Sequence, residues 1–418
     1  MKLYRLLPYI FALLITVNAV PAAAEEYVYY DDEDSSDPEI YYYDDSDSYD
    51  TNTESSDYIS DYSSDIDNST ETYLSSGELD MPETENEEDA SEDAGEEIPA
   101  FDPANIVEGT ITTNSIPGWP NGPAVKCASA ILVEESTGTV LYSADSDRIY
   151  YPSSPVKIMT CLLALENCDL SNEVTITETG LSGVTDGATT ISAQVDEVFT
   201  VEQLLYAIML ASANDASLQI AEYVGGSVDF FVEMMNDRAR EIGCNGTVFT
   251  NPTGLTDPGQ HTTAHDLALI METAMQNEEF QKIASATTYT IPPTNVSGGE
   301  RNLTNSFPMT DPGSDGYYPA CIAGKEGYTE ASGSVLTCMA EKDGLRLICA
   351  VMRGDDGTTA DQAAALLNYG FNNFKLMDIG SRDFSVMEGG IVLVPNTASS
   401  ADVESSDETT EEGQKRKD

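Results

Sequence analysis

A serine and a lysine that could act together stand three residues apart in Ser154-Pro155-Val156-Lys157. A serine hydroxyl is unreactive near neutral pH unless a neighbouring base takes its proton. The run that follows, Ile158 to Leu165, is apolar on every face and predicts a buried helix, in which residues three apart lie side by side. Burial disfavours an ammonium group, so Lys157 is expected to have a lowered pKa and to serve as the base. Ser153 has Val156 at the matching position and therefore has no base.

A second hydroxyl and an amide lie in Ser212-Ala213-Asn214, a short corner between two amphipathic stretches, Val201 to Leu210 and Ala216 to Val224, that predict helices. A further cation lies in Lys325-Glu326-Gly327. The three motifs together could supply a nucleophile, a base, a proton relay and a cation without using a histidine. Acyl transfer at a serine is the chemistry that these residues indicate.

The chain has two histidines, His261 and His265, which are four residues apart. This spacing resembles half of a zinc site, but Thr262 occupies the glutamate position of an H-E-x-x-H motif and no third ligand is evident. We therefore predict no metal site and favour a polar helix start capped by Thr262 or Thr263. The same inventory argues against a Ser-His-Asp triad, and no G-x-S-x-G turn is present.

The motifs, in this order, resemble those of the serine-type D-Ala-D-Ala carboxypeptidases, the low-molecular-mass penicillin-binding proteins that share their fold with serine β-lactamases. The resemblance extends from about Ala128 to Met377 and includes Asn251-Pro252-Thr253-Gly254-Leu255 and Tyr369-Gly370-Phe371. It implies a mixed α/β (α+β) fold in which helices cover a central antiparallel sheet. It also implies no metal and no organic cofactor.

The resemblance implies a role for each matching residue. Ser154 would be the acylated nucleophile and Lys157 its base, while Ser212 would relay a proton to the leaving D-alanine. Asn214 would hold the substrate backbone and Lys157. The backbone N–H groups of Ser154 and Tyr328 would form the oxyanion hole. The substrate-binding strand would comprise Lys325, which holds the substrate's terminal carboxylate, followed by Glu326, Gly327, Tyr328 and Thr329.

One position departs from the family pattern, because Lys325-Glu326-Gly327 stands where the family has Lys-Thr-Gly. If Glu326 is ionised and faces the cleft, it would repel the substrate's carboxylate by roughly 4 kcal/mol at about 4 Å and an effective dielectric near 20. Two alternatives are that Glu326 pairs with a cation, or that burial raises its pKa and keeps it protonated. We expect an active enzyme with altered selectivity, in which Glu326→Thr raises kcat/KM for D-Ala-D-Ala peptides.

The resulting hypothesis is an exported carboxypeptidase that removes the terminal D-alanine from peptidoglycan stem pentapeptides through an acyl-serine, with β-lactams as inhibitors. One alternative is a β-lactamase, which commonly hydrolyses its acyl-serine through a carboxylate-activated water. Glu166 is no candidate for that carboxylate, since it lies about 18 Å beyond Ser154 along the same predicted helix. The other alternative is a surface-displayed penicillin-binding-like protein with reduced or altered catalysis.

The first 121 residues have two unlike compositions. Residues 1–24 combine Lys2 and Arg5, an apolar run and Ala22-Ala23-Ala24, which predicts a secretory signal peptide. Residues 25–121 contain no lysine or arginine and predict a disordered acidic spacer rich in Tyr, Ser, Asp and Glu. The net charge of −56 argues against nucleic acid or an anionic membrane as a partner. We expect a secreted, extracellular, cell-wall associated protein with no strong membrane anchor after signal cleavage.

Residues 122–380 are predicted to form the carboxypeptidase domain, and residues 381–418 a short strand at Ile391 to Pro395 followed by a disordered tail. The order of elements in the domain, strands first, then helices, then strands and a last helix, favours an antiparallel sheet covered by helices. The predicted elements are strands Ala128–Val133, Thr139–Tyr142, Ser334–Ala340 and Arg346–Met352, and a last helix over Asp361–Phe374.

The seven cysteines are an odd number, so an exported chain would keep at least one thiol unpaired or pair it between chains. If Asp343-Gly344 is a two-residue hairpin loop, Lys342 faces Leu345 and Cys338 faces Cys349. This register permits a cross-strand disulfide, although the sequence does not determine the connectivity. Cys161 and Cys168, near the apolar helix, are expected to be buried thiols rather than catalysts.

Overall fold

The structure, a computed structural model, describes residues 98–185, 187–378 and 391–396. The predicted signal peptide, most of the predicted acidic spacer and nearly all of the predicted C-terminal tail lie outside the described residues. No helix in the described ranges is long and apolar enough to cross a membrane.

The folded domain begins earlier than the boundary predicted at residue 122. The Arg353 guanidinium donates a hydrogen bond to the Pro99 carbonyl at 2.9 Å and lies over the Phe101 ring. The Trp119 ring lies 5.1 Å from that of Phe374. Residues 98–121 are therefore part of the domain, because Phe101 and Trp119 pack on it, and the prediction of a disordered spacer is wrong for this part.

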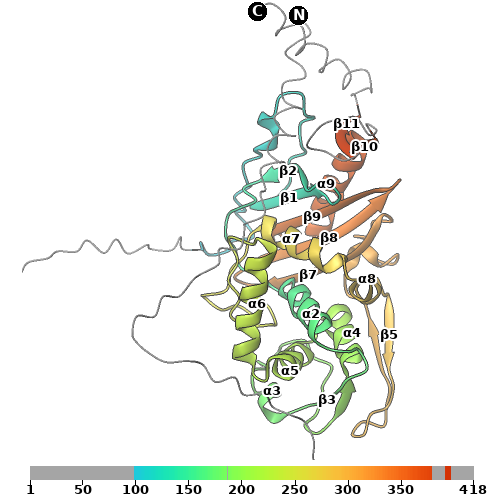
Figure 1. The fold of residues 1–418 in the computed structure, drawn as a ribbon. Coiled ribbons are helices and arrows are strands. Elements are labelled where there is room, and N and C mark those ends of the chain that lie inside the picture. The colour runs from blue at the N-terminus through green and yellow to red at the C-terminus, as the bar shows by residue number, and fades with distance from the viewer. Residues whose placement is uncertain (1–97, 186, 379–390, 397–418) are drawn as a thin grey trace, which may run out of the picture. The chain divides into compact units, whose positions relative to one another are not determined.

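A five-stranded antiparallel sheet forms the centre of the domain (Figure 1). Its strand order is β2-β1-β9-β8-β7, so that β7 is an edge strand and β1 and β9 come from opposite ends of the domain sequence. The strands are β1 (Ser129–Glu134), β2 (Thr139–Ala144), β7 (Cys321–Thr329), β8 (Gly333–Lys342) and β9 (Leu345–Gly354).

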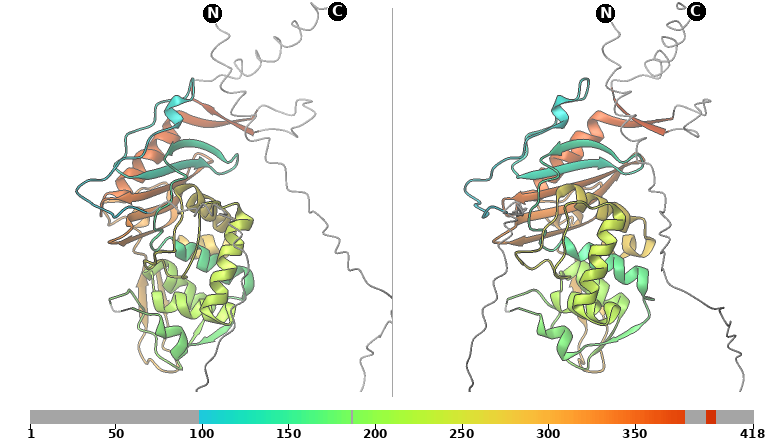
Figure 2. Two further views of the ribbon diagram at one scale, coloured as in Figure 1. Left: turned by 90° about the vertical axis from the view of Figure 1, so that its left-hand side faces the viewer. Right: turned by 60° about the vertical axis from the view of Figure 1, so that its left-hand side comes forward.

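Helices cover both faces of this sheet, because apolar side chains of β9 point alternately to one face and to the other. Leu347, Cys349 and Val351 contribute to a core shared with the last helix, α9, whereas Ile348, Ala350 and Met352 contribute to the core beneath the other helices. Figure 2 shows α9 on one side of the sheet and the larger group of helices on the other. The helices are α2 (Val156–Asn167), α3 (Glu178–Ser182), α4 (Val201–Ala211), α5 (Asn214–Gly225), α6 (Val228–Ile242), α7 (Ala264–Met275), α8 (Glu278–Ala284) and α9 (Thr359–Asn373).

Smaller elements complete the described part of the chain. Three two-stranded sheets pair β3 (Glu173–Thr175) with β4 (Val198–Thr200), β5 (Thr288–Ile291) with β6 (Arg301–Thr304), and β10 (Phe374–Asp378) with β11 (Ile391–Pro395). Two 3₁₀ turns are η1 (Thr113–Ser115) and η2 (Pro308–Thr310). The architecture confirms the predicted mixed α/β fold with a central antiparallel sheet covered by helices, and the strand predicted at Ile391 to Pro395 is β11.

The β8–β9 hairpin has the predicted two-residue loop. Asp343 and Gly344 have φ of 53° and 80°, and the register places Cys338 opposite Cys349. Both φ values lie in the left-handed region that a tight hairpin turn of this type requires. All seven cysteines fall within the described residues and are free thiols. The predicted register is confirmed, but the cross-strand disulfide that it would permit is not formed.

Candidate active site

Ser154 lies immediately before α2 and not inside it. Pro155 is the N-terminal cap with helical backbone angles, and the Lys157 N–H donates to the Ser154 carbonyl at 3.0 Å. This tight turn still places the side chains together, because the Lys157 Nζ lies 3.5 Å from the Ser154 Oγ. The predicted pairing of a hydroxyl with an amine is thus present, with the helix beginning two residues later than Ser154.

The Lys157 amine is completely buried and is surrounded by acceptors. Its Nζ donates to the Asn214 Oδ1 at 2.9 Å and to the Thr253 carbonyl. Burial lowers the pKa of Lys157 well below its ordinary value, and the nearby charge of Lys325 lowers it further. A neutral amine has two N–H groups, both of which these acceptors can take, and the remaining lone pair is then free to accept the proton of the Ser154 hydroxyl. The arrangement suits a general base.

The Ser212 hydroxyl donates a hydrogen bond to the Ser154 Oγ at 3.1 Å. Ser212 ends α4 with a φ of 54°, and α5 begins at Asn214. The left-handed turn makes the sharp corner that directs both residues toward α2. The Asn214 backbone N–H and its Nδ2 both donate to the Thr189 carbonyl, at 2.8 and 3.1 Å, which fixes the side-chain amide that meets Lys157.

The loop Asn251–Leu255 supplies the Thr253 carbonyl, a partner of Lys157 that sequence reasoning did not identify. The Asn251 Oδ1 accepts hydrogen bonds from the N–H groups of Thr253 and Gly254 and from the Thr253 hydroxyl. Gly254 has a φ of +83°, and a Cβ added there would lie 2.0 Å from the Ser153 carbonyl oxygen. The Asn-Pro-Thr-Gly motif can be recognised in the sequence, but the contact of its Thr253 carbonyl with Lys157 cannot.

The edge strand β7 brings the third motif to the nucleophile. A Cβ added to Gly327 would lie 2.5 Å from the Ser154 backbone nitrogen, so only glycine allows this approach. Lys325 is 2% exposed, and burial lowers its pKa to about 8. Beyond Gly327, Tyr328 is exposed and the Thr329 hydroxyl accepts a hydrogen bond from Thr256 at 3.1 Å. The strand therefore places the cation of Lys325 and the side-chain-free backbone of Gly327 beside the Ser154 segment.

Glu326 is half-buried and follows Lys325 on β7. Within the residues that the structure describes, its carboxylate makes no ion pair. Burial raises the pKa of Glu326 above its ordinary value; Lys325 lowers it and Asp356 raises it further. Of the two alternatives raised from the sequence, pairing with a cation is not found among the described residues, whereas burial shifts the pKa of Glu326 upward, in the direction of the second.

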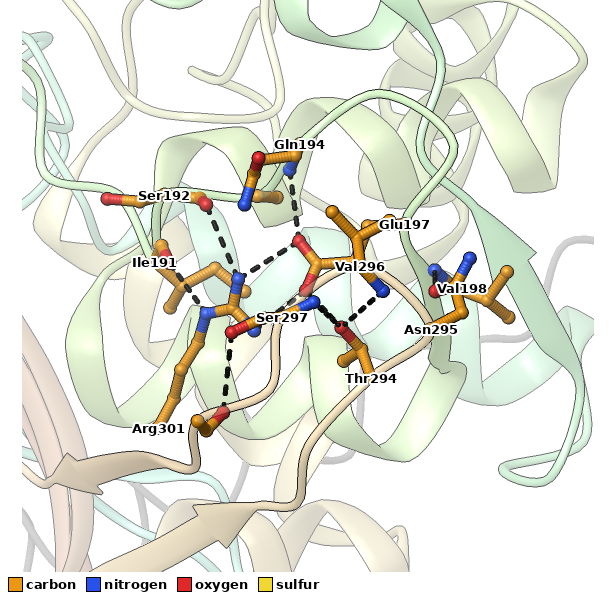
Figure 3. A network of polar contacts seen from close by, with 12 residues as sticks. Ile191, Ser192, Gln194, Glu197, Val198, Thr294, Asn295, Val296, Ser297 and Arg301 are labelled. Atoms are coloured by element: carbon orange, nitrogen blue, oxygen red, sulfur yellow. Dashed lines mark hydrogen bonds and ion pairs between the residues drawn. The ribbon is translucent and has the colours of Figure 1, made fainter.

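A buried ion pair between Arg301 and Glu197 holds the segment from Ile191 to Glu197 (Figure 3). Arg301 on β6 pairs with the fully buried carboxylate of Glu197 at 2.9 Å and donates to the Ile191 carbonyl at 3.0 Å. The Asp215 carboxylate accepts a hydrogen bond from the Ile191 N–H at 3.1 Å. Burial raises the pKa of Glu197, but hydrogen bonds from Arg301 and Thr294 outweigh this and hold it below its ordinary value.

Removing the cation of this pair is expected to destabilise the domain strongly. Arg301→Met keeps the length of the side chain but leaves the Glu197 charge buried without its partner, which should lower the free energy of unfolding by about 3–5 kcal/mol in a urea titration. Lys282→Met is the control, since Lys282 makes an exposed ion pair with Glu279 at 3.1 Å and should change stability little. Equal effects of the two substitutions would contradict the argument.

Two other charged residues have structural partners. Glu166, rejected from the sequence as a base, forms an ion pair with Arg238 at 2.8 Å. The His265 Nδ1 lies 2.9 Å from an Asp147 carboxylate oxygen, and Thr263 caps the helix α7 on which His265 lies. These contacts account for residues whose types alone could indicate catalysis or metal binding.

Comparison with known proteins agrees with this geometry. The family profile for peptidase S11, D-alanyl-D-alanine carboxypeptidase, matches residues 117–356, more than half of the chain. A D-alanyl-D-alanine carboxypeptidase of Bacillus subtilis is 33% identical over 269 residues, which cover 63% of this chain and 67% of the relative. One from Mycobacterium tuberculosis is 33% identical over 274 residues, covering 63% and 87%.

The fold is shared with a solved structure. Penicillin-binding protein 6B from Escherichia coli superposes with a TM-score of 0.59 at 25% identity, covering 67% of this chain and 88% of that one. Members of the matched family act at the bacterial cell wall on peptides ending in D-Ala-D-Ala and bind penicillin. Both the sequence match and the fold place the chain in the S11 family of serine-type D-Ala-D-Ala carboxypeptidases, the low-molecular-mass penicillin-binding proteins.

Proposed function

We propose that this protein is an exported carboxypeptidase that removes the terminal D-alanine from peptidoglycan stem pentapeptides through an acyl-serine. The observation that carries the proposal is the environment of Lys157. Its amine is buried, both of its N–H groups have acceptors, and it lies 3.5 Å from the Ser154 Oγ. This is the arrangement that a serine nucleophile without a histidine needs.

In the first half-reaction, the Ser154 Oγ attacks the carbonyl of the penultimate D-alanine while its proton moves to the Lys157 Nζ. The carbonyl oxygen becomes negative and would accept hydrogen bonds from the Ser154 and Tyr328 N–H groups. The close approach of Gly327, the neighbour of Tyr328, to the Ser154 backbone nitrogen supports this assignment. The C–N bond then breaks. The proton passes from Lys157 through the Ser212 hydroxyl to the departing D-alanine amine, because Ser212 lies 3.1 Å from the Ser154 Oγ, which by then carries the acyl group and has no proton of its own.

In the second half-reaction, water attacks the acyl-serine ester, Lys157 takes a proton from that water, and Ser154 is released with its proton restored. Lys325 would provide the cation for the substrate's terminal carboxylate, and Asn214 would hold the substrate backbone and Lys157. Glu166 is committed to Arg238 at 2.8 Å, so it does not supply a second base for fast hydrolysis of a penicilloyl ester. This favours a carboxypeptidase over a β-lactamase.

The test is made with the full chain, a pentapeptide ending in D-Ala-D-Ala, and penicillin. We expect release of free D-alanine, and a single long-lived penicillin adduct seen by intact-protein mass spectrometry. Fragmentation of the labelled peptide should place the adduct on Ser154 and not on the adjacent Ser153. Absence of both D-alanine release and an adduct would overturn the proposal, and rapid turnover of penicillin would favour the β-lactamase alternative.

A further inference from the structure

Glu326 lies close to the reaction centre but on the other face of the strand from Lys325. Lys325 is paired across the sheet with Thr337 and lies near Lys157 and Cys161 of α2. Glu326 is paired with Leu336, whose side chain belongs to the core on the α9 side. Because side chains alternate along a strand, the two charges lie on opposite sides of β7.

The position of β7 makes both faces relevant to a substrate. β7 is an edge strand of the sheet, so no further strand of the described residues pairs with its outer side, and Gly327 contacts the Ser154 backbone. Consecutive residues of a strand are about 3.3 Å apart, similar to the length of one amino acid of a bound peptide. A leaving group that extends one residue from the carbonyl attacked by Ser154 therefore ends beside Lys325 and Glu326.

Two carboxylates, those of Glu326 and Asp356, contribute negative charge at this end of the site. Asp356, in the exposed turn after β9, adds negative charge to the surroundings of Glu326. Arg353 does not neutralise the carboxylate of Glu326 or that of Asp356. Its guanidinium donates to the Pro99 and Ala331 carbonyls and lies over aromatic rings. Glu326 thus has the negative charge of Asp356 near it and, in the described part of the chain, forms no ion pair with Lys325.

We propose that Glu326 sets the substrate class of this enzyme, so that acyl-D-alanyl peptides whose terminal carboxyl group is neutral, as an amide or ester, are preferred to those ending in a free carboxylate. The inference rests on the function proposed above and deepens it. The chemistry is unchanged: Ser154 attacks the same carbonyl, the same C–N bond breaks, and the departing amine of D-alaninamide or of a D-alanine ester receives the proton.

The experiment compares two peptides that are identical except for a C-terminal acid or amide. The measured quantity is the ratio of kcat/KM for the amide to that for the acid, in wild type and in Glu326→Gln, which removes the charge at nearly constant shape. We expect the ratio to fall about thirtyfold in Glu326→Gln, the Coulomb effect of two unit charges about 8 Å apart at an effective dielectric near 20. Glu330→Gln is the matched control, because this exposed glutamate lies in the turn directly after β7 and its loss changes the net charge equally.

The same ratio is measured with penicillin and its carboxyl methyl ester, as rates of adduct formation, so that a poor peptide substrate does not hide the effect. An unchanged ratio in Glu326→Gln, or an equal fall in Glu330→Gln, would overturn the role of Glu326 while Ser154 still became acylated. If no variant released product or formed an adduct, the proposed function itself would fail and this inference with it. Thermal unfolding of each variant checks that the fold is retained.

Discussion

Replacing Lys157 with arginine is expected to reduce acylation of Ser154 by about a thousandfold or more. A guanidinium cannot accept a proton, because arginine stays protonated in proteins, and a positioned general base contributes about 10²–10⁴ in rate. The larger, planar group also does not fit an amine pocket that is completely buried between Asn214 and Thr253. The measurement is the rate of penicillin adduct formation by mass spectrometry, with Ser154→Ala as the reference that has no nucleophile.

The control is Lys282→Arg, an exposed lysine for which the same change should leave acylation unaltered. The pH profile of the wild type gives a second readout. The rate should rise with pH as Lys157 loses its proton at its lowered pKa, and fall as Lys325, with a pKa of about 8, loses its charge. Undiminished acylation by a folded Lys157→Arg would mean that the base lies elsewhere.

Gly254→Ala is expected to disrupt both stability and activity. An alanine at a φ of +83° is strained by about 1–2 kcal/mol. Its Cβ would also lie 2.0 Å from the Ser153 carbonyl oxygen, a backbone atom that cannot turn aside. The loop or the segment before α2 must therefore move, which displaces the Thr253 carbonyl from Lys157 and Ser154 from Ser212. We expect a loss of more than about 3 kcal/mol in a urea titration and a penicillin acylation rate at least tenfold lower.

Gly344→Ala separates the effect of backbone strain from the effect of the close contact with Ser153. Gly344 has a φ of +80° in the β8–β9 loop, but a Cβ added there would contact nothing within 4 Å. It should show the conformational strain alone, about 1–2 kcal/mol, with normal acylation. A Gly254→Ala protein as stable and as active as Gly344→Ala would show that the close packing against Ser153 is easily relieved.

Local patterns predicted much of this molecule. The pairing of Ser154 with Lys157 follows from a spacing of three residues at a helix start, and the β8–β9 register follows from a two-residue loop. Both depend on geometry within a few residues. The same holds for the corner between α4 and α5, where one helix ends at Ala211 and the next begins at Asn214.

What the sequence did not predict depends on contacts between distant segments. The Thr253 carbonyl meets Lys157 across 96 residues, and it is a backbone group that no residue type announces. Residues 98–121 lack lysine and arginine, like the acidic stretch before them, yet Phe101 and Trp119 pack on the domain. The motif Lys325-Glu326-Gly327 does not determine which face of β7 carries the Glu326 side chain, because this depends on the pairing with Leu336 of β8.

The hydrogen bonds of the buried lysine also carry information about the order of folding. Lys157 joins three parts of the chain, its own helix, a corner 57 residues away and a loop 96 residues away. Closing such loops comes late compared with forming a local helix. A refolding chain would gain helical signal before its lysine is desolvated and able to take a proton. Covalent labelling by a fluorescent penicillin therefore marks molecules in which all three segments have met, and its time course reports the last stage of folding.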